Sequence, residues 1–114
     1  RVLCGKNNAQ NDWLTNRLAG KNDIWFHVKG LPGSHVVLLC GGEEPPASDF
    51  TEAANIAAVY SKAPRGQKTE VDYTRVKNIK KPPASKPGYV TFSSNYSAVV
   101  TPDPDAAERL RKRS

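Results

Sequence analysis

The sequence contains no methionine, only two cysteines and no long apolar run. A helix that crosses a bilayer needs roughly 20 consecutive apolar residues, so we expect no membrane partner. The missing methionine at position 1 and the absence of a signal-peptide pattern predict a piece of a longer cytoplasmic protein. The cysteines, Cys4 and Cys40, lie in apolar, strand-like segments, which favours buried thiols in a reducing cytosol. A disulfide stays possible only if the two strands are neighbours.

Acidic residues are fewer than basic ones, with 11 Asp and Glu against 17 Lys and Arg and a net charge of +6. This excess favours a polyanionic partner, with nucleic acid first and an acidic membrane surface second. A domain that merely happens to be basic is the alternative. The cations are concentrated between Lys62 and Lys86, where only Glu70 and Asp72 oppose them. This concentration favours nucleic acid.

The motifs of catalysis and metal binding are also missing. Ser34 and His35 are neighbours on a predicted strand, so their side chains point to opposite faces and cannot form a dyad without a bulge. His27, His35 and the cysteines lack the paired spacing of a zinc site. The sequence has no phosphate-binding Gly-Lys-Ser/Thr loop and no dinucleotide fingerprint. We therefore expect no enzyme, no cofactor and no metal.

What is present is organised around residues 23–39, which read as two strands joined by a tight corner. Residues 24–29 alternate between apolar and polar, residues 30–34 have hairpin punctuation, and residues 36–39 form an apolar run typical of a strand covered on both sides. If the corner pairs Lys29 with His35, one end of one face gathers Trp25, His27, Lys29 and His35. We expect a binding surface there.

Helices are predicted before and after this hairpin. The first is capped by Asn7, with Gln10 as its capping-box partner, and ends at Gly20. Its small polar residues Asn11, Asp12 and Thr15 favour a network that ties the helix to the hairpin, with ligand contact as the alternative. The second helix is capped by Ser48 and carries an alanine-rich apolar stripe that suits close packing on a sheet.

Strands are predicted at residues 71–77, 89–92 and 96–100, followed by a short helix capped by Asp103. On the first of these, Tyr73 and Lys77 share a face that suits backbone contact and base stacking with RNA. The predicted fold class is α+β, a single domain with a mainly antiparallel sheet of about five strands and two principal helices.

Several motifs occur in a specific order over nearly the whole chain: Gly5–Thr15, Asp23–Lys29, Pro32–Val36, Val71–Thr74, and Lys80–Pro82 with the turn Lys86–Gly88. In this order they resemble the NFACT-R domain, the RNA-binding part of the NFACT (RqcH-like) family. The sequence departs from the family at Pro83 and Ala84, where a Lys-Gly pair is expected.

The resemblance implies that residues 1–114 are an NFACT-R-like RNA-binding domain from the C-terminal part of a longer protein. Family members bind the obstructed large ribosomal subunit and recruit tRNA in ribosome-associated quality control, which in bacteria supports the tailing of stalled nascent chains. The implied partners are tRNA, the rRNA of the large subunit and other domains of the parent chain. The residues implied to contact RNA are Lys6, His27, Lys29, Ser34, His35, Tyr73, Lys77, Lys80, Lys81 and Lys86.

Three alternatives stay open beside this non-catalytic function. Bacterial members are also labelled fibronectin-binding proteins, which implies an adhesin module. An RNA-modifying or hydrolytic enzyme would use His27 or His35. A structural module would dock on ribosomal protein rather than on RNA.

Overall fold

The structure is a computed structural model that describes residues 1–113. Its elements in chain order are β1 (Val2–Cys4), α1 (Asn8–Trp13), η1 (Leu14–Leu18), β2 (Ile24–Val28), β3 (Val36–Leu38), α2 (Ala47–Val59), β4 (Thr69–Arg75), η2 (Val76–Asn78), β5 (Ile79–Lys80), β6 (Thr91–Phe92), β7 (Tyr96–Val100) and α3 (Pro104–Arg113). The segment η1 is a turn of π-helix that continues α1, and η2 is a 3-10 turn.

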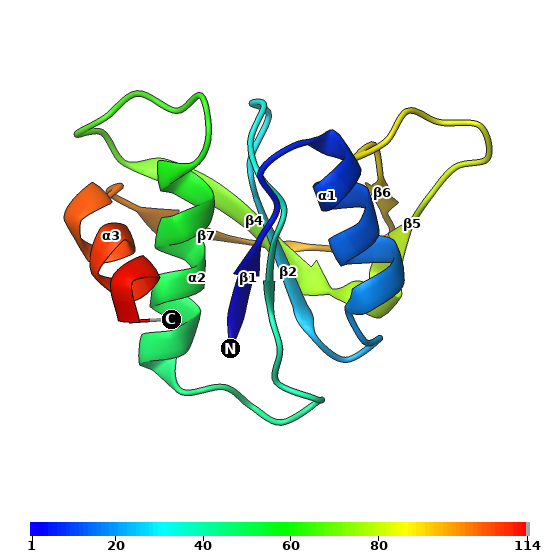
Figure 1. The fold of residues 1–114 in the computed structure, drawn as a ribbon, viewed down its shortest axis with the longest axis horizontal. Helices are drawn as coiled ribbons and strands as arrows, with labels where there is room; N and C mark the ends of the chain where they lie inside the picture. The colour runs from blue at the N-terminus through cyan, green and yellow to red at the C-terminus, as the bar shows by residue number, and fades with distance from the viewer. Residues whose placement is uncertain (114) are drawn as a thin grey trace.

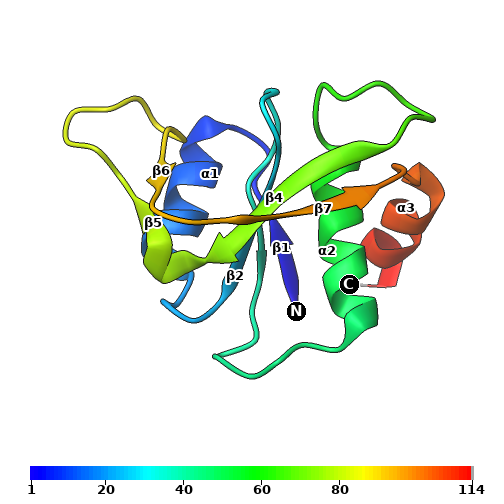
Figure 2. The same ribbon diagram turned by 180° about the vertical axis from the view of Figure 1, so that it is seen from behind.

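The main sheet is antiparallel and has the strand order β1-β3-β2-β4-β7. Figures 1 and 2 show it between two layers, with α2 and α3 on one side and α1 with the small β5-β6 sheet on the other. The α+β class and the antiparallel sheet are therefore confirmed. The predicted strand at 89–92 shortens to β6 and pairs with β5 outside the main sheet.

The face toward α2 is apolar. Phe26, Val36 and Leu38 are at most 1% exposed and pack with four buried alanines of α2, which are Ala53, Ala54, Ala57 and Ala58. Alanine has the smallest side chain that still forms helix well, so α2 lies close against the strands. The predicted role of this helix as a packing element is confirmed.

The opposite face is covered by α1, η1 and the β5-β6 sheet. Trp25, Val37 and Leu14 form its buried cluster. Trp25 is 2% exposed, so its predicted place on an open binding face is wrong. Ile79 and Val90 cover this cluster, and the ring of Phe92 lies 5.6 Å from the Trp25 ring.

The register between β2 and β3 also corrects the hairpin. Ile24 lies opposite Leu38 and Phe26 opposite Val36, so the same register extended by one step brings His27 level with His35. The expected pairing of Lys29 with His35 is wrong by two residues. A shift of two residues keeps every side chain on its predicted face, because side chains alternate with period two.

The helix starts were predicted with mixed success. The Asn7 side chain accepts a hydrogen bond from Gln10 N at 2.9 Å, and Asp103 accepts one from Ala106 N at 3.2 Å, so both caps are confirmed. Ser48 is not a cap: α2 begins at Ala47 after Pro46, which makes no side-chain cap bond. The fixed φ of proline suits a helix start, which explains the earlier beginning.

Cys4 and Cys40 are both free thiols. Their strands are neighbours, but Cys4 lies opposite Val36 while Cys40 follows the other end of β3. Burial raises the pKa of the Cys4 thiol, against the lowering effect of a hydrogen bond with Ser34. None of the described helices is long and apolar enough to reach across a bilayer.

Candidate nucleic-acid interface

Four segments far apart in the sequence lie side by side along one end of the molecule, at the top of both Figure 1 and Figure 2, with the loops 60–68 and 81–89 at its two sides. They are residues 5–8 before α1, the hairpin 29–34, the connection 60–68 after α2, and the loop 81–89 between β5 and β6. We call this end of the molecule the rim.

The hairpin and the connection after α2 are joined through their backbones. Gly33 and Ser61 form an isolated antiparallel bridge. Lys62 N donates to Pro32 O at 2.9 Å, and Ser34 N donates to Tyr60 O at 3.0 Å. A Cβ atom on Gly33 would lie 2.9 Å from the Ser61 Cβ, so this close approach requires glycine.

The hairpin is also joined to α1, through His35. Gly5 N donates to His35 O at 3.0 Å, and His35 N donates to Asn11 Oδ1 at 3.1 Å. Thr15 Oγ1 lies 2.7 Å from His35 Nδ1, and both side chains are buried. The predicted network that ties the first helix to the hairpin is therefore confirmed for Asn11 and Thr15.

The loop 81–89 is held on α1 by Asp12. The Asp12 carboxylate accepts a hydrogen bond from Gly88 N at 3.2 Å and forms an ion pair with Lys81 Nζ at 2.9 Å. The Lys81 ammonium also donates to the carbonyl oxygens of Lys86 and Tyr89. These hydrogen bonds lower the pKa of Asp12, with the Lys81 bond contributing most. Lys81 thus closes the loop on itself.

The turn at the end of this loop has the predicted geometry. Tyr89 N donates to Lys86 O at 3.1 Å, and Gly88 has a φ of 83°, as position i+2 of a type II turn requires. Ala84 has a φ of 59° and is the only described residue other than glycine with a positive φ. It occupies the position where the sequence departs from the family's expected glycine.

Basic side chains gather on these segments. All of them are exposed except Lys81, which is partly buried. We call this set the basic rim: Lys6, Lys29, Lys62, Arg65, Lys68, Lys81 and Lys86.

Lys29 is held at the edge of the rim by an ion pair. Its ammonium lies 2.9 Å from Asp72 Oδ1, and this bond raises the pKa of Lys29. Asp72 also accepts hydrogen bonds from Asn95 and Ser97 at 2.9 and 3.0 Å. The Lys29 side chain remains 45% exposed, so its ammonium still has free directions for a phosphate oxygen.

Both histidines lie beneath the rim rather than on it. The His27 ring stacks on Trp25 with a centroid distance of 5.7 Å, and the His35 ring meets the His27 ring edge-on at 5.6 Å. His35 is 3% exposed. Burial lowers the pKa of His27 and lowers that of His35 to about 4, helped by the neighbouring His27. Near pH 7 both rings are neutral, so neither adds positive charge to the surface.

Two of the residues implied to contact RNA lie away from the rim, and a third, Lys80, lies just before its loop 81–89. Tyr73 faces the α2 layer, where its ring lies 4.7 Å from Phe50 and 5.7 Å from Tyr96. Lys77 lies in the turn η2 at the opposite end of β4, where its N–H donates to Lys21 O at 2.9 Å. Lys80 is exposed on β5. Lys6, Lys29, Ser34, Lys81 and Lys86 all lie on the rim.

Sequence reasoning missed two exposed aromatic residues. Trp13 at the end of α1 is 56% exposed, and Tyr89 in the loop 81–89 is 55% exposed. Exposed aromatic rings beside cations suit stacking with unpaired bases. The signal for Trp13 was its place beside Leu14, outside the predicted Leu14 and Leu18 stripe of the helix.

The described residues offer little for catalysis or metal binding. Among residues 1–113, Thr15 and His35 are the only hydroxyl and imidazole side chains that share a hydrogen bond, and both are buried. Within residues 1–113 the structure places no cluster of three or more His, Cys, Asp or Glu residues that could hold a metal ion.

Comparison with known proteins adds three findings. The profile described as NFACT protein RNA binding domain matches residues 1–94. The chain is 48% identical over 111 residues to the Rqc2 homolog RqcH of Bacillus subtilis, and 41% identical over 110 residues to that of Streptococcus suis. These matches cover 97% and 96% of this chain but only 19% and 20% of the relatives. The chain therefore spans about a fifth of the length of the curated relatives it matches.

A solved structure agrees with the fold. The C-terminal part of the fibronectin/fibrinogen-binding protein from Streptococcus suis superimposes with a TM-score of 0.89 at 42% identity. The match covers 95% of this chain and 44% of that one.

Proposed function

Because the chain belongs to the NFACT RNA-binding domain family, we propose that it binds tRNA or the rRNA of the large ribosomal subunit, without catalysis, in cytoplasmic ribosome-associated quality control. The observation that carries this proposal is the basic rim, which brings cations from four separate segments to one end of the molecule. Phosphate contacts dominate the affinity of proteins for nucleic acids. A gathered set of exposed cations is suited to such contacts.

The proposal divides the implied residues by role. Lys6, Lys29 and Lys86, with Lys62 beside them, contact phosphates directly. Ser34 lies at the hairpin corner, where its backbone is held by Tyr60. His27, His35 and Lys81 act indirectly, because they hold the hairpin and the loop 81–89 in place. Tyr73, Lys77 and Lys80 would contact RNA only if the ligand extends beyond the rim.

Titration of the chain with tRNA at several salt concentrations tests the proposal. We expect the affinity to fall with salt at a log–log slope of roughly 0.7 to 0.9 per phosphate contacted. The double variant Lys62→Glu, Lys86→Glu reverses charge on two separate rim segments and should weaken binding about tenfold or more at moderate salt. A flat salt response would contradict RNA binding by charge.

The matched control for the single variant Lys62→Glu is Lys21→Glu, which makes the same charge change at the opposite end of the sheet. It should leave the affinity for tRNA within about twofold, because exposed charges more than a Debye length away are largely screened. Equal losses from both variants would show that only net charge matters, and the rim would lose its assigned role. Sedimentation of the parent protein with large subunits, before and after nuclease treatment, tests the ribosomal part.

A second candidate function rests on the structural relative, which is named a fibronectin/fibrinogen-binding protein. Under that candidate the chain would bind immobilised fibronectin more tightly than tRNA at equal salt. Parallel titrations separate the two, and the Lys62→Glu, Lys86→Glu variant should affect only the tRNA arm if the first proposal is right.

A further inference from the structure

The strand β1 is an open edge of the main sheet. It pairs only with β3, and no described strand lies on its other side. Gly5 N donates to His35 O at 3.0 Å, and Leu39 N donates to Arg1 O at 2.8 Å. Because bonded residues alternate along an antiparallel strand, the backbone groups of Val2 and Cys4 point away from β3. They are free to pair with an added strand.

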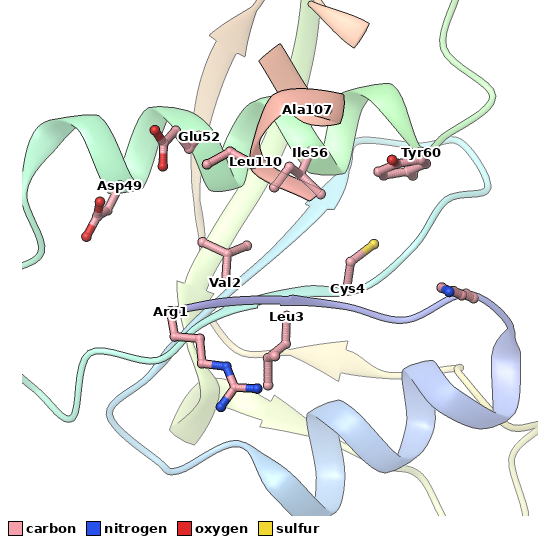
Figure 3. A pocket seen from close by; sticks show the side chains of 11 residues that line it. Arg1, Val2, Leu3, Cys4, Asp49, Glu52, Ile56, Tyr60, Ala107 and Leu110 are labelled. Carbon is pink, nitrogen blue, oxygen red and sulfur yellow. The ribbon is translucent and has the colours of Figure 1, made fainter. Parts of the chain in front are cut away.

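A groove runs along this open edge. Its volume is about 740 Å³, and it is bounded by β1, α2 and α3. Figure 3 shows Val2 and Cys4 facing α2, with Ile56 and Leu110 across the groove from them. The groove therefore joins an apolar floor to a free strand edge, which are the two features by which extended peptides are bound as added strands.

The α2 wall of the groove is acidic. Asp49 and Glu52 lie on α2 at the Val2 end of the groove (Figure 3), and neither forms an ion pair with a described residue. The Arg1 side chain, just before β1, points away from α2 on the far side of the strand in Figure 3. The two carboxylates thus face the groove without a cationic partner among the described side chains.

We propose that this groove binds an extended segment of another protein as a sixth strand of the sheet, pairing with Val2 and Cys4. The segment presents apolar side chains toward Ile56 and Leu110, and a Lys or Arg toward Asp49 and Glu52. RNA is disfavoured at the Val2 end of the groove, because its phosphates would meet the two carboxylates there, while Lys6 lines the groove elsewhere. A second copy is disfavoured by the +6 charge that each copy carries. The groove borders the basic rim at Lys6 and Tyr60, so its test reads strand pairing at Val2 and Cys4 rather than affinity for RNA.

The test uses isotope-labelled chain and the peptide acetyl-Thr-Val-Thr-Val-Thr-Lys-Thr-Lys-amide, which places Val and Lys on one face when extended. With the peptide at about 1 mM, where weak binding is populated, we expect the amide protons of Val2 and Cys4 to exchange about tenfold more slowly. The Leu3 amide, already directed to β3, should not change. Unchanged exchange at Val2 and Cys4 would overturn the proposal.

Two modified peptides separate strand pairing from simple attraction. One carries N-methyl groups on its Val and Lys residues, and the other carries them on its Thr residues. An antiparallel strand loses its bonds to β1 with the first, and a parallel strand loses them with the second. Equal protection by both would show that no backbone pairing occurs. Replacing the two lysines of the peptide by Glu should weaken binding about tenfold, and unaltered binding would refute the acidic wall.

Variants of the chain complete the design. Val2→Pro removes one outward N–H without touching the bonds to β3, as an edge strand tolerates, and should abolish protection at Cys4. Glu52→Gln should weaken binding of the lysine peptide about threefold, whereas Glu108→Gln, outside the groove lining, should not. Protection at Val2 and Cys4 that rises with chain concentration alone would assign the edge to a second copy and contradict the proposal. Protection produced by tRNA alone would do the same.

Discussion

The two faces of the main sheet are packed by different kinds of contact. Toward α2 the contacts are apolar, with Phe26 and Val36 completely buried. Toward α1 an apolar cluster around Trp25 borders His35, which is hydrogen-bonded to Thr15 and Asn11. Apolar burial is not directional, while hydrogen bonds fix position and angle. The α2 face therefore supplies stability, and the α1 face sets where the hairpin and the loop 81–89 lie.

The largest effect should come from the apolar face. Phe26→Ala should lower the free energy of unfolding by about 3–5 kcal/mol, because it leaves a cavity beneath α2. Denaturant unfolding followed by circular dichroism measures this change. For a domain of this size that loss approaches the whole stability. A loss below about 1 kcal/mol would mean that the α2 face is not the main source of stability.

The next largest effect should be a dependence of the unfolding free energy on pH, caused by His35 on the α1 face. The pKa of His35 is about 4 in the folded state and about 6.5 when unfolded. Between these values the unfolded chain binds a proton that the folded chain does not. The free energy of unfolding should therefore fall by up to about 3 kcal/mol as the pH drops from about 6.5 to 4, and His27 acts in the same direction.

Denaturant titrations across this pH range check the prediction. His35→Asn keeps a polar atom near Thr15 but removes the titrating ring, so its stability should vary less with pH than that of the original chain. A wild-type profile that is flat between about pH 4 and 6.5 would show that His35 is not held neutral by burial. The pH dependence of stability would then not distinguish the α1 face from the α2 face.

A smaller effect on stability, with a local effect on structure, is expected at Asp12. Asp12→Ala removes the ion pair to Lys81 and the bond from Gly88. The pair is partly exposed, so the cost in unfolding free energy should be about 1 kcal/mol or less. Amide exchange in the loop 81–89 should nevertheless quicken about tenfold, while Glu43→Ala in another exposed loop leaves it unchanged. Unaltered exchange would mean that Asp12 does not position the loop.

The smallest effect is expected within the same loop. Ala84 has a φ of 59°, a region that costs a residue with a side chain roughly 1 kcal/mol. Ala84→Gly should raise the unfolding free energy by a few tenths of a kcal/mol, because the greater freedom of unfolded glycine offsets part of the relief. Ala9→Gly in α1, a helical position, should have the opposite sign. Thermal unfolding of both variants measures the sign of each change in stability.

The sequence predicted elements with strong periodicity better than it predicted contacts. Alternation located β2, an unbroken apolar run located β3, and capping residues located α1 and α3. The register of the hairpin could not be read, because a slip of two residues preserves the face of every side chain. Burial of Trp25 was missed for a related reason. Residues 79–92 fold back over it from far along the chain. No local sequence pattern predicts that such a distant segment will cover the Trp25 ring.

The candidate site followed the same division. Composition indicated the cations, and the resemblance to a family selected most of those that lie on the rim. It could not separate Lys29, which stays exposed, from His35, which is buried, since both flank the same corner. The assignment of RNA contacts to particular side chains remains a prediction.

The backbone hydrogen bonds that join the hairpin to α1 and to the connection after α2 have a consequence for the rate of binding. These turns are joined to one another by hydrogen bonds within the chain itself, so under the proposed function RNA would meet a surface whose shape is already set. Little chain entropy is then lost on docking, and the association rate should be governed by charge attraction and diffusion rather than by loop rearrangement. Loosening one of these fastenings would slow capture even where every lysine is kept.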